Sequence, residues 1–244
     1  MPNRILINIG NTHVQVADVV SGRPRLMAKY DTNAILHSGV LPCLENLRDF
    51  DATALCVVPK MQEILQKKYG GQILFLTKDD FPQLDFSLVD VSTLGMDRIS
   101  NAAFAFSLNK GAVMVIDFGT CIISVVVNEK GQFLGGAICP GRMLMRQALA
   151  EHTAQLPLVP IIHDTPDAIG NNTKDAICAG IDNGIVGAVR ELIAGARNEL
   201  DSPCTFLATG GDAVYFLKRI PDLIPAPELM TLRGILCAVV DKKA

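Results

Sequence analysis

Two short segments of the sequence repeat one pattern, and together they constrain the fold more than any other feature. Ile7–Thr12 and Ile116–Thr120 each follow an apolar run and precede a second stretch with strand character. Each therefore predicts a β-hairpin with glycine in its turn. Such a turn leaves backbone N–H groups and short polar side chains to bind an anion such as a phosphate. Two copies in a chain of 244 residues predict a duplicated fold, whose turns face each other across a cleft and hold one nucleotide.

The composition excludes several classes of protein. The chain is 49% hydrophobic with a mean hydropathy of +0.31, so it can bury a large core in one or two domains. Its 22 Lys and Arg against 25 Asp and Glu give a net charge of −3, with no basic surplus for nucleic acid. No apolar run reaches the roughly 18 residues of a membrane span, and no signal-peptide region opens the chain. We expect a soluble cytoplasmic protein with no nucleic-acid or membrane partner.

The cysteines predict buried thiols rather than a disulfide framework or a zinc site. They number seven, an odd count, most lie within apolar runs, and none forms a C-x-x-C pair. They are Cys43, Cys56, Cys121, Cys139, Cys178, Cys204 and Cys237.

The hydrophobic pattern predicts the same order of elements in both halves. In the first half we expect strands at 4–9, 12–19 and 24–30, a helix at 34–47, a strand at 54–58, a helix at 61–69 and a strand at 72–76. A helix at 99–108 leads into the second half, where we expect strands at 112–117, 121–127 and 133–138. A helix after Gly141 and a long helix from about Thr173 follow these strands. The half then ends with a strand at 204–208, a helix, and a last helix near 232–240. Asn172 or Thr173 is the expected N-cap of the long helix. The predicted halves are residues 1–109 and 110–244.

Further motifs make the chain resemble one family. In order they are Gly10-Asn11-Thr12, Val57-Val58-Pro59, Gly95-Met96-Asp97-Arg98, Asp117-Phe118-Gly119-Thr120, Gly135–Gly141, Thr153–Pro157, Gly170–Thr173, Thr209-Gly210-Gly211 and Leu232-Arg233-Gly234. This ordered set resembles the type III pantothenate kinases over nearly the whole chain, and Gly95–Arg98 resembles their Gly-x-Asp-Arg signature. Each motif alone is common, whereas the ordered set is specific. The resemblance implies a duplicated actin-like (ribonuclease H-like) α/β ATPase fold, with two similar halves around a nucleotide cleft.

The resemblance also implies a reaction, the transfer of the ATP γ-phosphoryl group to the primary hydroxyl of pantothenate, which is the first step toward coenzyme A. A hydroxyl nucleophile needs a positioned carboxylate to accept its proton, and Asp97 matches the family's proton acceptor. Arg98 offers a planar fork for the pantothenate carboxylate. Gly95, Met96 and Thr173 complete the expected substrate site. Taken alone, the Asp-Arg pair is also compatible with an ordinary helix N-terminus, where Asp97 favours the helix dipole.

On the nucleotide side, the resemblance assigns the two glycine turns to ATP. The expected contacts are Asn8, Gly10, Asn11, Thr12, Gln15, Gly119 and Thr120. Asp117 matches the position that holds a monovalent cation, K⁺ or NH₄⁺, beside the Mg²⁺ of the nucleotide. Without the resemblance, each turn could equally be a structural hairpin turn.

Several positions depart from the family pattern. The family's first loop opens with Asp where this chain has Asn8, so we expect a weakened Mg²⁺ site, because hard cations favour carboxylates. Many members have Lys at the position of Gln15, and an aromatic residue at that of Leu88. The stretch 121–125 lacks the family's usual threonines. This erosion is compatible with an impaired kinase, and also with a non-catalytic regulatory homologue, such as an accessory factor for transcription. A phosphotransferase acting on another small hydroxyl compound is a third alternative.

The small residues Gly180, Gly184 and Gly187 lie at helical spacing and give the long helix a small-residue face. That face suits either close helix packing in the core or a dimer interface. The family is dimeric, so the resemblance implies a homodimer.

Overall fold

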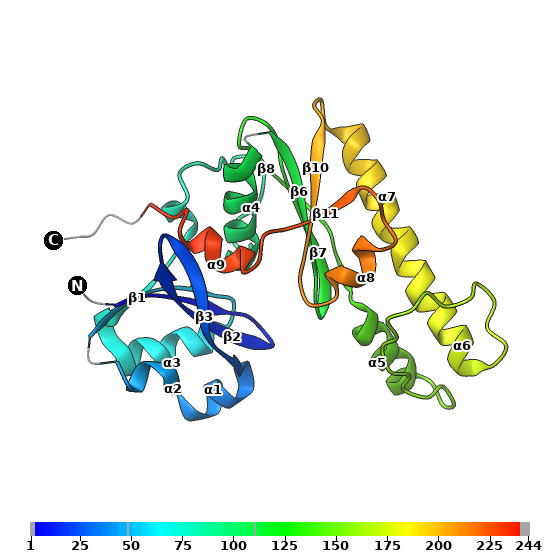
Figure 1. The fold of residues 1–244 in the computed structure, drawn as a ribbon, viewed down its shortest axis with the longest axis horizontal. Helices are drawn as coiled ribbons and strands as arrows, with labels where there is room; N and C mark the ends of the chain where they lie inside the picture. The colour runs from blue at the N-terminus through cyan, green and yellow to red at the C-terminus, as the bar shows by residue number, and fades with distance from the viewer. Residues whose placement is uncertain (1–2, 48, 110, 240–244) are drawn as a thin grey trace. The chain divides into compact units, whose positions relative to one another are not determined.

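The computed structural model describes residues 3–47, 49–109 and 111–239. Their contacts divide them into two compact units, each with its own sheet (Figure 1). Among the described residues, the first unit contains 3–109, 131–133 and 228–239, and the second contains 111–130 and 134–227. No helix in these ranges is long and apolar enough to cross a membrane.

The first unit is built on a five-stranded mixed sheet in the order β3-β2-β1-β4-β5. The strands are β1 (Asn3–Ile9), β2 (His13–Val20), β3 (Arg23–Asp31), β4 (Phe50–Cys56) and β5 (Ile73–Phe75). β1 pairs antiparallel with β2 and parallel with β4. Ile5, Leu6 and Ile7 are fully buried, because β1 lies at the centre of the sheet and is covered on both faces.

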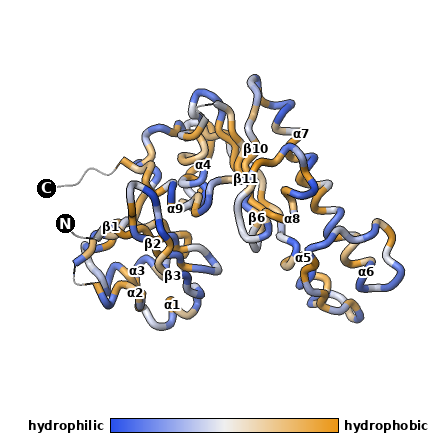
Figure 2. The backbone as a smooth tube through the Cα atoms, in the orientation of Figure 1, coloured by the Kyte–Doolittle hydropathy of each residue, from blue (hydrophilic) through white to orange (hydrophobic). Residues whose placement is uncertain are grey.

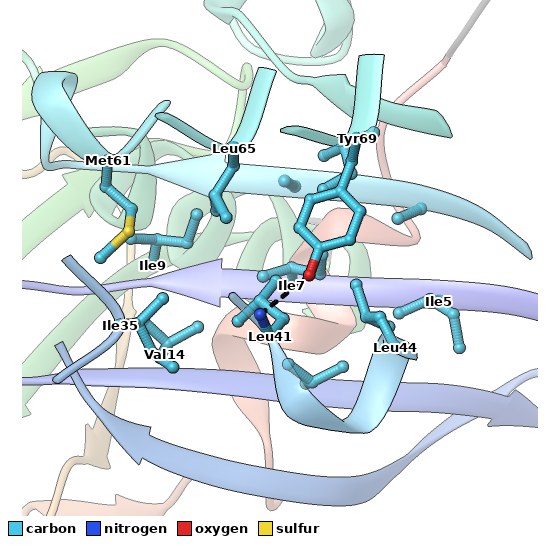
Figure 3. Close-up of a cluster of buried hydrophobic side chains, with 14 of the residues drawn as sticks. Ile5, Ile7, Ile9, Val14, Ile35, Leu41, Leu44, Met61, Leu65 and Tyr69 are labelled. Atoms are coloured by element: carbon cyan, nitrogen blue, oxygen red, sulfur yellow. Dashed lines mark hydrogen bonds between the residues drawn. The ribbon is translucent and has the colours of Figure 1, made fainter. Parts of the chain in front are cut away.

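Three helices pack their apolar residues against this sheet (Figure 3). They are α1 (Thr32–Ser38), α2 (Pro42–Glu45) and α3 (Pro59–Tyr69), and two 3₁₀ turns follow at Gly70–Gln72 and Lys78–Asp80. The buried Tyr69 hydroxyl accepts from the Leu41 N–H at 2.9 Å and donates to Glu45 at 3.0 Å. The single helix predicted at 34–47 is wrong: α1 ends at Ser38, Gly39 caps it in a left-handed conformation with φ +66°, and Pro42 begins α2.

Two further helices, α4 (Met96–Asn109) and α9 (Met230–Ile235), pack against each other and complete the first unit. Their contact is close, because a Cβ on Gly234 would overlap the backbone of Ser100. The Ser100 hydroxyl donates to the Thr231 carbonyl at 2.8 Å, and the Thr231 hydroxyl donates to Asn101 at 2.9 Å. By its contacts α9 therefore groups with the first unit, whereas the sequence placed all of 110–244 in the second half. The end of the last predicted helix, residue 240, lies outside the described residues.

The second unit has a six-stranded sheet in the order β11-β10-β6-β7-β8, with β9 also paired to β7. The strands are β6 (Ala112–Phe118), β7 (Cys121–Val127), β8 (Phe133–Gly135), β9 (Ile138–Pro140), β10 (Cys204–Thr209) and β11 (Leu223–Pro225). β6 and β10 are among the most hydrophobic segments in Figure 2. The predicted strand at 133–138 is two short strands, because Gly135 has φ +107°, outside the extended region, and the Ala137 N–H donates to the Ser124 hydroxyl at the break, at 2.9 Å.

The helices of the second unit are α5 (Arg142–His152), α6 (Thr173–Cys178), α7 (Gly184–Glu199) and α8 (Ala213–Leu217). Asn172 caps α6 by accepting from the Asp175 N–H at 3.0 Å, which confirms the predicted cap. A π-helical turn, Ala179–Asn183, joins α6 to α7. The long helix predicted from about Thr173 therefore contains a local irregularity of the kind often found at functional positions.

The two sheets share one plan. In each unit the first strand lies at the centre, pairs antiparallel with the second strand and parallel with the strand that follows the helices. The order 3-2-1-4-5 is the same in both, counting strands from β1 and from β6 and leaving β9 aside. This agreement supports a duplicated α/β fold. The nucleotide cleft predicted between the two turns stays a prediction.

Candidate active site

The first glycine turn joins β1 to β2 and is held by the start of α1. The Gly10 N–H donates to the His13 carbonyl at 3.0 Å and closes the turn. The buried Thr32, the first residue of α1, holds the turn through two hydrogen bonds. Its hydroxyl donates to the Gly10 carbonyl at 2.8 Å, and its N–H donates to the Thr12 carbonyl at 3.0 Å. Gly10 is half-buried, and Asn11 and Thr12 are exposed. The turn is thus an exposed loop on a rigid support, as expected for a phosphate loop.

Asn8 and Gln15, two predicted ATP contacts, are partners of each other. They lie directly opposite across β1 and β2, and the Asn8 Nδ2 donates to the Gln15 Oε1 at 3.2 Å. The Asn8 Oδ1 is buried and accepts no hydrogen bond from the described residues. The two departures from the family pattern are therefore one neutral amide pair. The hairpin register would have revealed it, but the sequence reasoning treated the two positions separately.

The Gly95–Arg98 signature forms the start of α4. Asp97 and Arg98 are half-buried in its first turn. The Asp97 Oδ1 accepts from the Arg98 N–H at 2.8 Å, and the Arg98 Nη2 donates to the Thr93 carbonyl at 3.2 Å. Neither side chain forms an ion pair with another described residue. A carboxylate and a guanidinium therefore lie next to each other without being neutralised by protein charges.

The second glycine turn, between β6 and β7, is enclosed by backbone from two directions. On one side the Gly141 N–H donates to the Thr120 carbonyl at 2.8 Å, and on the other the Asp212 N–H donates to the Phe118 carbonyl at 2.9 Å. A Cβ on Gly141 would overlap the Gly119 carbonyl, and one on Gly210 would overlap Asp117 and Phe118. Gly210 also has φ +97°, which favours glycine. These two sequence motifs therefore serve to build this loop.

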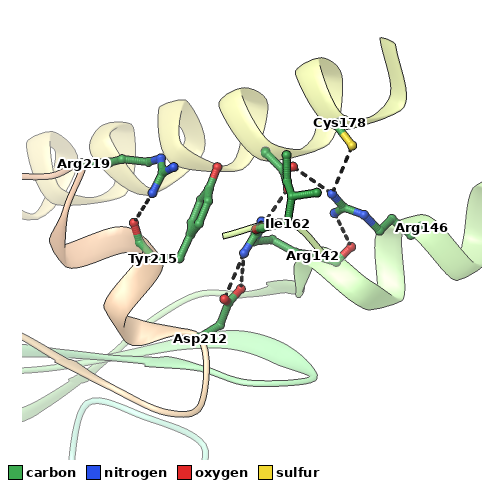
Figure 4. Close-up of polar contacts among 8 residues, drawn as sticks. Arg142, Arg146, Ile162, Cys178, Asp212, Tyr215 and Arg219 are labelled. Atoms are coloured by element: carbon green, nitrogen blue, oxygen red, sulfur yellow. Dashed lines mark hydrogen bonds and ion pairs between the residues drawn. The ribbon is translucent and has the colours of Figure 1, made fainter. Parts of the chain in front are cut away.

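A buried charged network that the sequence analysis did not find lies beside this loop (Figure 4). Asp182 accepts from the Arg142 Nε at 2.8 Å and from the Arg146 Nη2 at 2.7 Å, and all three side chains are fully buried. The Arg142 Nη1 donates to Asp212 at 2.9 Å. The Arg142 guanidinium also stacks on the Tyr215 ring at 3.4 Å. A signal was present: Arg142 and Arg146 are four residues apart on one helix, and Asp182 lies among apolar residues.

Burial raises the pKa of two members of the network. Desolvation raises the pKa of Asp212, and the adjacent Arg142 charge only partly opposes it. Desolvation also raises the pKa of the Tyr215 hydroxyl, so this group stays neutral at ordinary pH. The hydroxyl has no hydrogen-bond partner among the described residues. The network therefore holds its charges in a poorly solvated environment.

An apolar groove of about 820 Å³ lies in the second unit, and Thr173 is on its wall. Its lining comes from the end of β9, from α5, α6 and the π-helical turn, and from one loop position, namely Pro140, Leu144, Met145, Ala148, Leu149, Leu156, Thr173, Ala176, Ile177, Gly180 and Ile181. Gly180, Gly184 and Gly187 are exposed, and a Cβ on any of them would meet no described atom within 4 Å. Close packing of this glycine face inside the chain, one of the two sequence interpretations, is therefore wrong.

The structure also describes the cysteines, Leu88 and the metal-ligating side chains. All seven cysteines are free thiols, but only Cys178 is buried and the other six are half-buried, so the predicted burial is confirmed for Cys178 alone. Leu88, aligned with a substrate-packing aromatic residue, is 60% exposed. Among the described residues no three His, Cys, Asp or Glu side chains gather as a metal site.

A family model described as type III pantothenate kinase matches residues 4–195, most of the chain. This chain belongs to the type III pantothenate kinase family. A type III pantothenate kinase of Dehalococcoides mccartyi strain 195 is 30% identical over 254 residues, with 95% of each chain covered. One from strain CBDB1 is 40% identical over 144 residues, 58% of this chain and 54% of the relative, so this closer alignment spans about half of that relative.

Solved structures confirm the actin-like fold. A conserved protein of Campylobacter jejuni, described as a Baf family transcriptional activator, is 19% identical, has a TM-score of 0.64 and covers 95% of this chain and 94% of its own. The archaeal actin homolog Ta0583 is 10% identical, has a TM-score of 0.50, and covers 96% and 97%. At these identities the likeness concerns the fold alone. Membership of the pantothenate kinase family rests on the sequence, whose signature Gly95–Arg98 lies within the matched residues.

Proposed function

We propose that this chain is a cytoplasmic pantothenate kinase that transfers the γ-phosphoryl group of ATP to the primary hydroxyl of pantothenate, giving 4′-phosphopantothenate. The single observation that carries the proposal is the pair at the start of α4. Asp97 and Arg98 are half-buried and adjacent, with no ion-pair partner among the described residues. In a family named for this reaction, a carboxylate and a guanidinium left unpaired suit a substrate with a hydroxyl and a carboxylate.

The two side chains divide the work on the substrate. Asp97 accepts the proton of the attacking hydroxyl as the bond to phosphorus forms. Arg98 binds the pantothenate carboxylate through a charge-assisted, planar contact. The close contact of α4 with α9 holds this pair in place, since Ser100 and Asn101 are buried and hydrogen-bonded to Thr231. Thr173, on the wall of the apolar groove, is the third substrate contact in the proposal.

The two glycine turns are the proposed phosphate loops. Gly10, Asn11 and Thr12 form the first, and Gly119 and Thr120 the second. Backbone N–H groups and hydroxyls at such turns suit phosphate oxygens. The exposed Asn11, Thr12, Gly119 and Thr120 are accessible to a nucleotide in the isolated units.

The oxygen donors near these turns fit the expected cations. The Asn8 Oδ1 is a buried acceptor without a hydrogen-bond partner among the described residues, and Asp117 supplies a carboxylate. Oxygen ligands of this kind suit Mg²⁺ and K⁺. In the proposal Asn8 contacts the Mg²⁺ of the nucleotide and Asp117 holds K⁺ or NH₄⁺. When bound, such cations offset phosphate charge.

Replacing Asn8 with aspartate tests the metal side of the proposal. We expect Asn8→Asp to raise turnover and to lower the Mg²⁺ concentration needed for half-maximal rate, because a carboxylate is the better ligand for a hard cation. The Gln15 amide opposite can rotate to donate to the new carboxylate. Initial rates measured over a series of Mg²⁺ concentrations give the result, with the exposed Asn198→Asp on α7 as control. A slower Asn8→Asp variant would show instead that Asn8 is adapted to this site.

The exposed glycine face and the neighbouring apolar groove support a homodimer. An uncovered apolar groove of about 820 Å³, continuous with Gly180, is unusual on a monomer surface. We therefore expect sedimentation equilibrium to give twice the chain mass of 26.2 kDa. Substituting Gly184 with glutamate should shift the protein toward the monomer, whereas Asn198→Glu on an exposed part of the same helix should not. A purely monomeric wild type at micromolar concentration would contradict the dimer.

A coupled assay of ADP release, with and without pantothenate, tests the function itself. We expect ADP release that depends on pantothenate, needs Mg²⁺ and responds to K⁺ or NH₄⁺. Mass spectrometry of the product should show one added phosphoryl group on pantothenate. Release that is independent of pantothenate but appears with another hydroxyl compound would reassign the substrate. No release with any acceptor would contradict the enzymatic proposal.

A further inference from the structure

The second glycine turn owes its shape to two separate backbone segments, and one side chain connects them. Gly141 contacts the turn from the α5 side, through its N–H to the Thr120 carbonyl at 2.8 Å. The Gly210–Asp212 segment contacts it from the β10 side, through the Asp212 N–H to the Phe118 carbonyl at 2.9 Å. These segments are about 70 residues apart in sequence, and a direct side-chain contact joins them, from Arg142 to Asp212.

Arg142 is placed to make this link by its position in the chain. It is the first residue of α5, directly after Gly141. Its Nη1 donates to both carboxylate oxygens of Asp212, at 2.9 and 3.2 Å. The guanidinium therefore connects the two backbone segments that contact the turn, Gly141 on one side and Gly210–Asp212 on the other.

Arg142 is itself rigidly held. Its Nε donates to Asp182 at 2.8 Å, its Nη2 donates to the Ile162 carbonyl at 2.5 Å, and its plane stacks on Tyr215 (Figure 4). The side chain is fully buried, and so is Asp182, whose other oxygen accepts from Arg146. Lysine cannot reproduce these contacts, because a single ammonium lacks the fork that reaches three acceptors in different directions.

We propose that Arg142 and Asp212 are positioning residues for the nucleotide: their ion pair clamps the two backbone walls around the Asp117–Thr120 turn and so sets its affinity for the ATP phosphates. The proposal deepens the proposed function and rests on it. Neither residue needs to touch ATP. Their effect reaches the nucleotide through the backbone bonds to Thr120 and Phe118.

The environment of Asp212 allows its effect on nucleotide binding to be separated from its effect on folding stability. Burial raises the pKa of Asp212, so the folded protein disfavours its negative charge on balance. Replacing the carboxylate by a neutral amide should then cost little folding free energy, while it weakens the bond to Arg142. Asp212→Asn is therefore the informative variant. Arg142→Lys is the second variant, which keeps the charge and removes the fork.

The test compares binding and kinetics in the full chain. For Asp212→Asn we expect about a tenfold increase in KM for ATP and in Kd for Mg²⁺-AMP-PNP, the loss of roughly one charge-assisted bond. The kcat and the KM for pantothenate should change less than about twofold, and the melting temperature should be unchanged. Arg142→Lys should raise the KM for ATP in the same way, but it should also lower the melting temperature, because it breaks the buried contacts with Asp182 and the Ile162 carbonyl. The control is Asp222→Asn, which removes an exposed carboxylate paired with Arg197 in the same unit.

A pH profile adds a readout that a purely structural role would not move. The groups that face Asp212 are Arg142 on α5, Asp182 on the π-helical turn, His163 in the loop before α6 and Tyr215 on α8. As pH falls through the raised pKa of Asp212, the KM for ATP of the wild type should rise, because protonation breaks the pair with Arg142. In Asp212→Asn this change should vanish, whereas any contribution of His163 should remain.

The outcomes separate the clamp from the proposed function. A folded Asp212→Asn with unchanged ATP KM and unchanged AMP-PNP affinity overturns the clamp and leaves the kinase intact. If the wild type binds AMP-PNP but does not phosphorylate pantothenate, the proposed function fails, and the weaker AMP-PNP binding of Asp212→Asn still supports the clamp. A wild type that binds no AMP-PNP overturns the clamp as well. Equal losses in kcat, pantothenate KM and melting temperature would mean a general structural role, and would also overturn it.

Discussion

Replacing Asp97 with asparagine should lower kcat by about 10²–10⁴-fold, the usual contribution of a positioned general base. The amide keeps the size of the side chain and can still accept from the Arg98 N–H, as the Asp97 Oδ1 does at 2.8 Å. It cannot take the proton of the pantothenate hydroxyl. Because Asp97 is not among the proposed ATP contacts, the Kd for Mg²⁺-AMP-PNP should change little. Steady-state kinetics with both substrates, together with nucleotide titration, give the answer.

Two other variants make the result specific. Asp79→Asn removes an exposed carboxylate that pairs with Lys78, and should leave kcat unchanged. Arg98→Ala should mainly raise the KM for pantothenate, because it removes the charge-assisted contact to the substrate carboxylate and leaves the base in place. Retention of more than about a tenth of the wild-type kcat in Asp97→Asn would assign the base to another residue.

Replacing Asp182 with asparagine should reduce the free energy of unfolding by about 3–5 kcal/mol. Among the described residues, Asp182 is the only carboxylate paired with both Arg142 and Arg146, and the three side chains are fully buried. The neutral amide leaves two buried guanidiniums with too little negative charge, and its NH₂ group opposes one of them. Urea unfolding followed by far-ultraviolet circular dichroism measures the change, read in the transition of the second unit.

The matched control for Asp182 is again an Arg–Asp pair, but an exposed one. Asp222→Asn breaks its contact with Arg197, where both side chains are more than a third exposed, and should cost no more than about 1 kcal/mol. An Asp182→Asn variant that loses less than about 1 kcal/mol would mean that water reaches the network and screens its charges. The difference between the two variants is therefore a direct measure of the burial of the network.

Much of this chain follows from local sequence. The hairpins β1-β2 and β6-β7 form because an apolar run, a glycine turn and a second strand-like stretch lie in succession, and each of these signals acts over a few residues. The Asn172 cap was predicted for the same reason, since a side-chain amide reaches an N–H three residues on. The ordered motifs also identified the family, because they lie in the same order as in the family and extend over nearly the whole chain.

The contacts that support the candidate site depend on residues far apart in sequence. Gly234 was recognised only as part of a motif, but the structure shows that it lets α9 pack on α4, which carries Asp97 and Arg98. Asn8 and Gln15 looked like two independent departures, until the register of β1 and β2 paired them.

The buried network shows most clearly what local sequence patterns do not predict. In the sequence, the i, i+4 spacing of Arg142 and Arg146 and the apolar neighbours of Asp182 are a weak signal, and local patterns place charged residues at the surface. Charged side chains can be buried only when partners of opposite charge meet them, and that meeting depends on how α5, the π-helical turn and the Gly210–Asp212 segment pack together. The sequence by itself therefore determined most of the strands, the two glycine turns and the family of this chain, although it did not predict β11 and merged β8 with β9. Tertiary structure alone decided which of its charges are neutralised inside the fold, because that neutralisation requires side chains 40 and 70 positions apart to lie within hydrogen-bond distance.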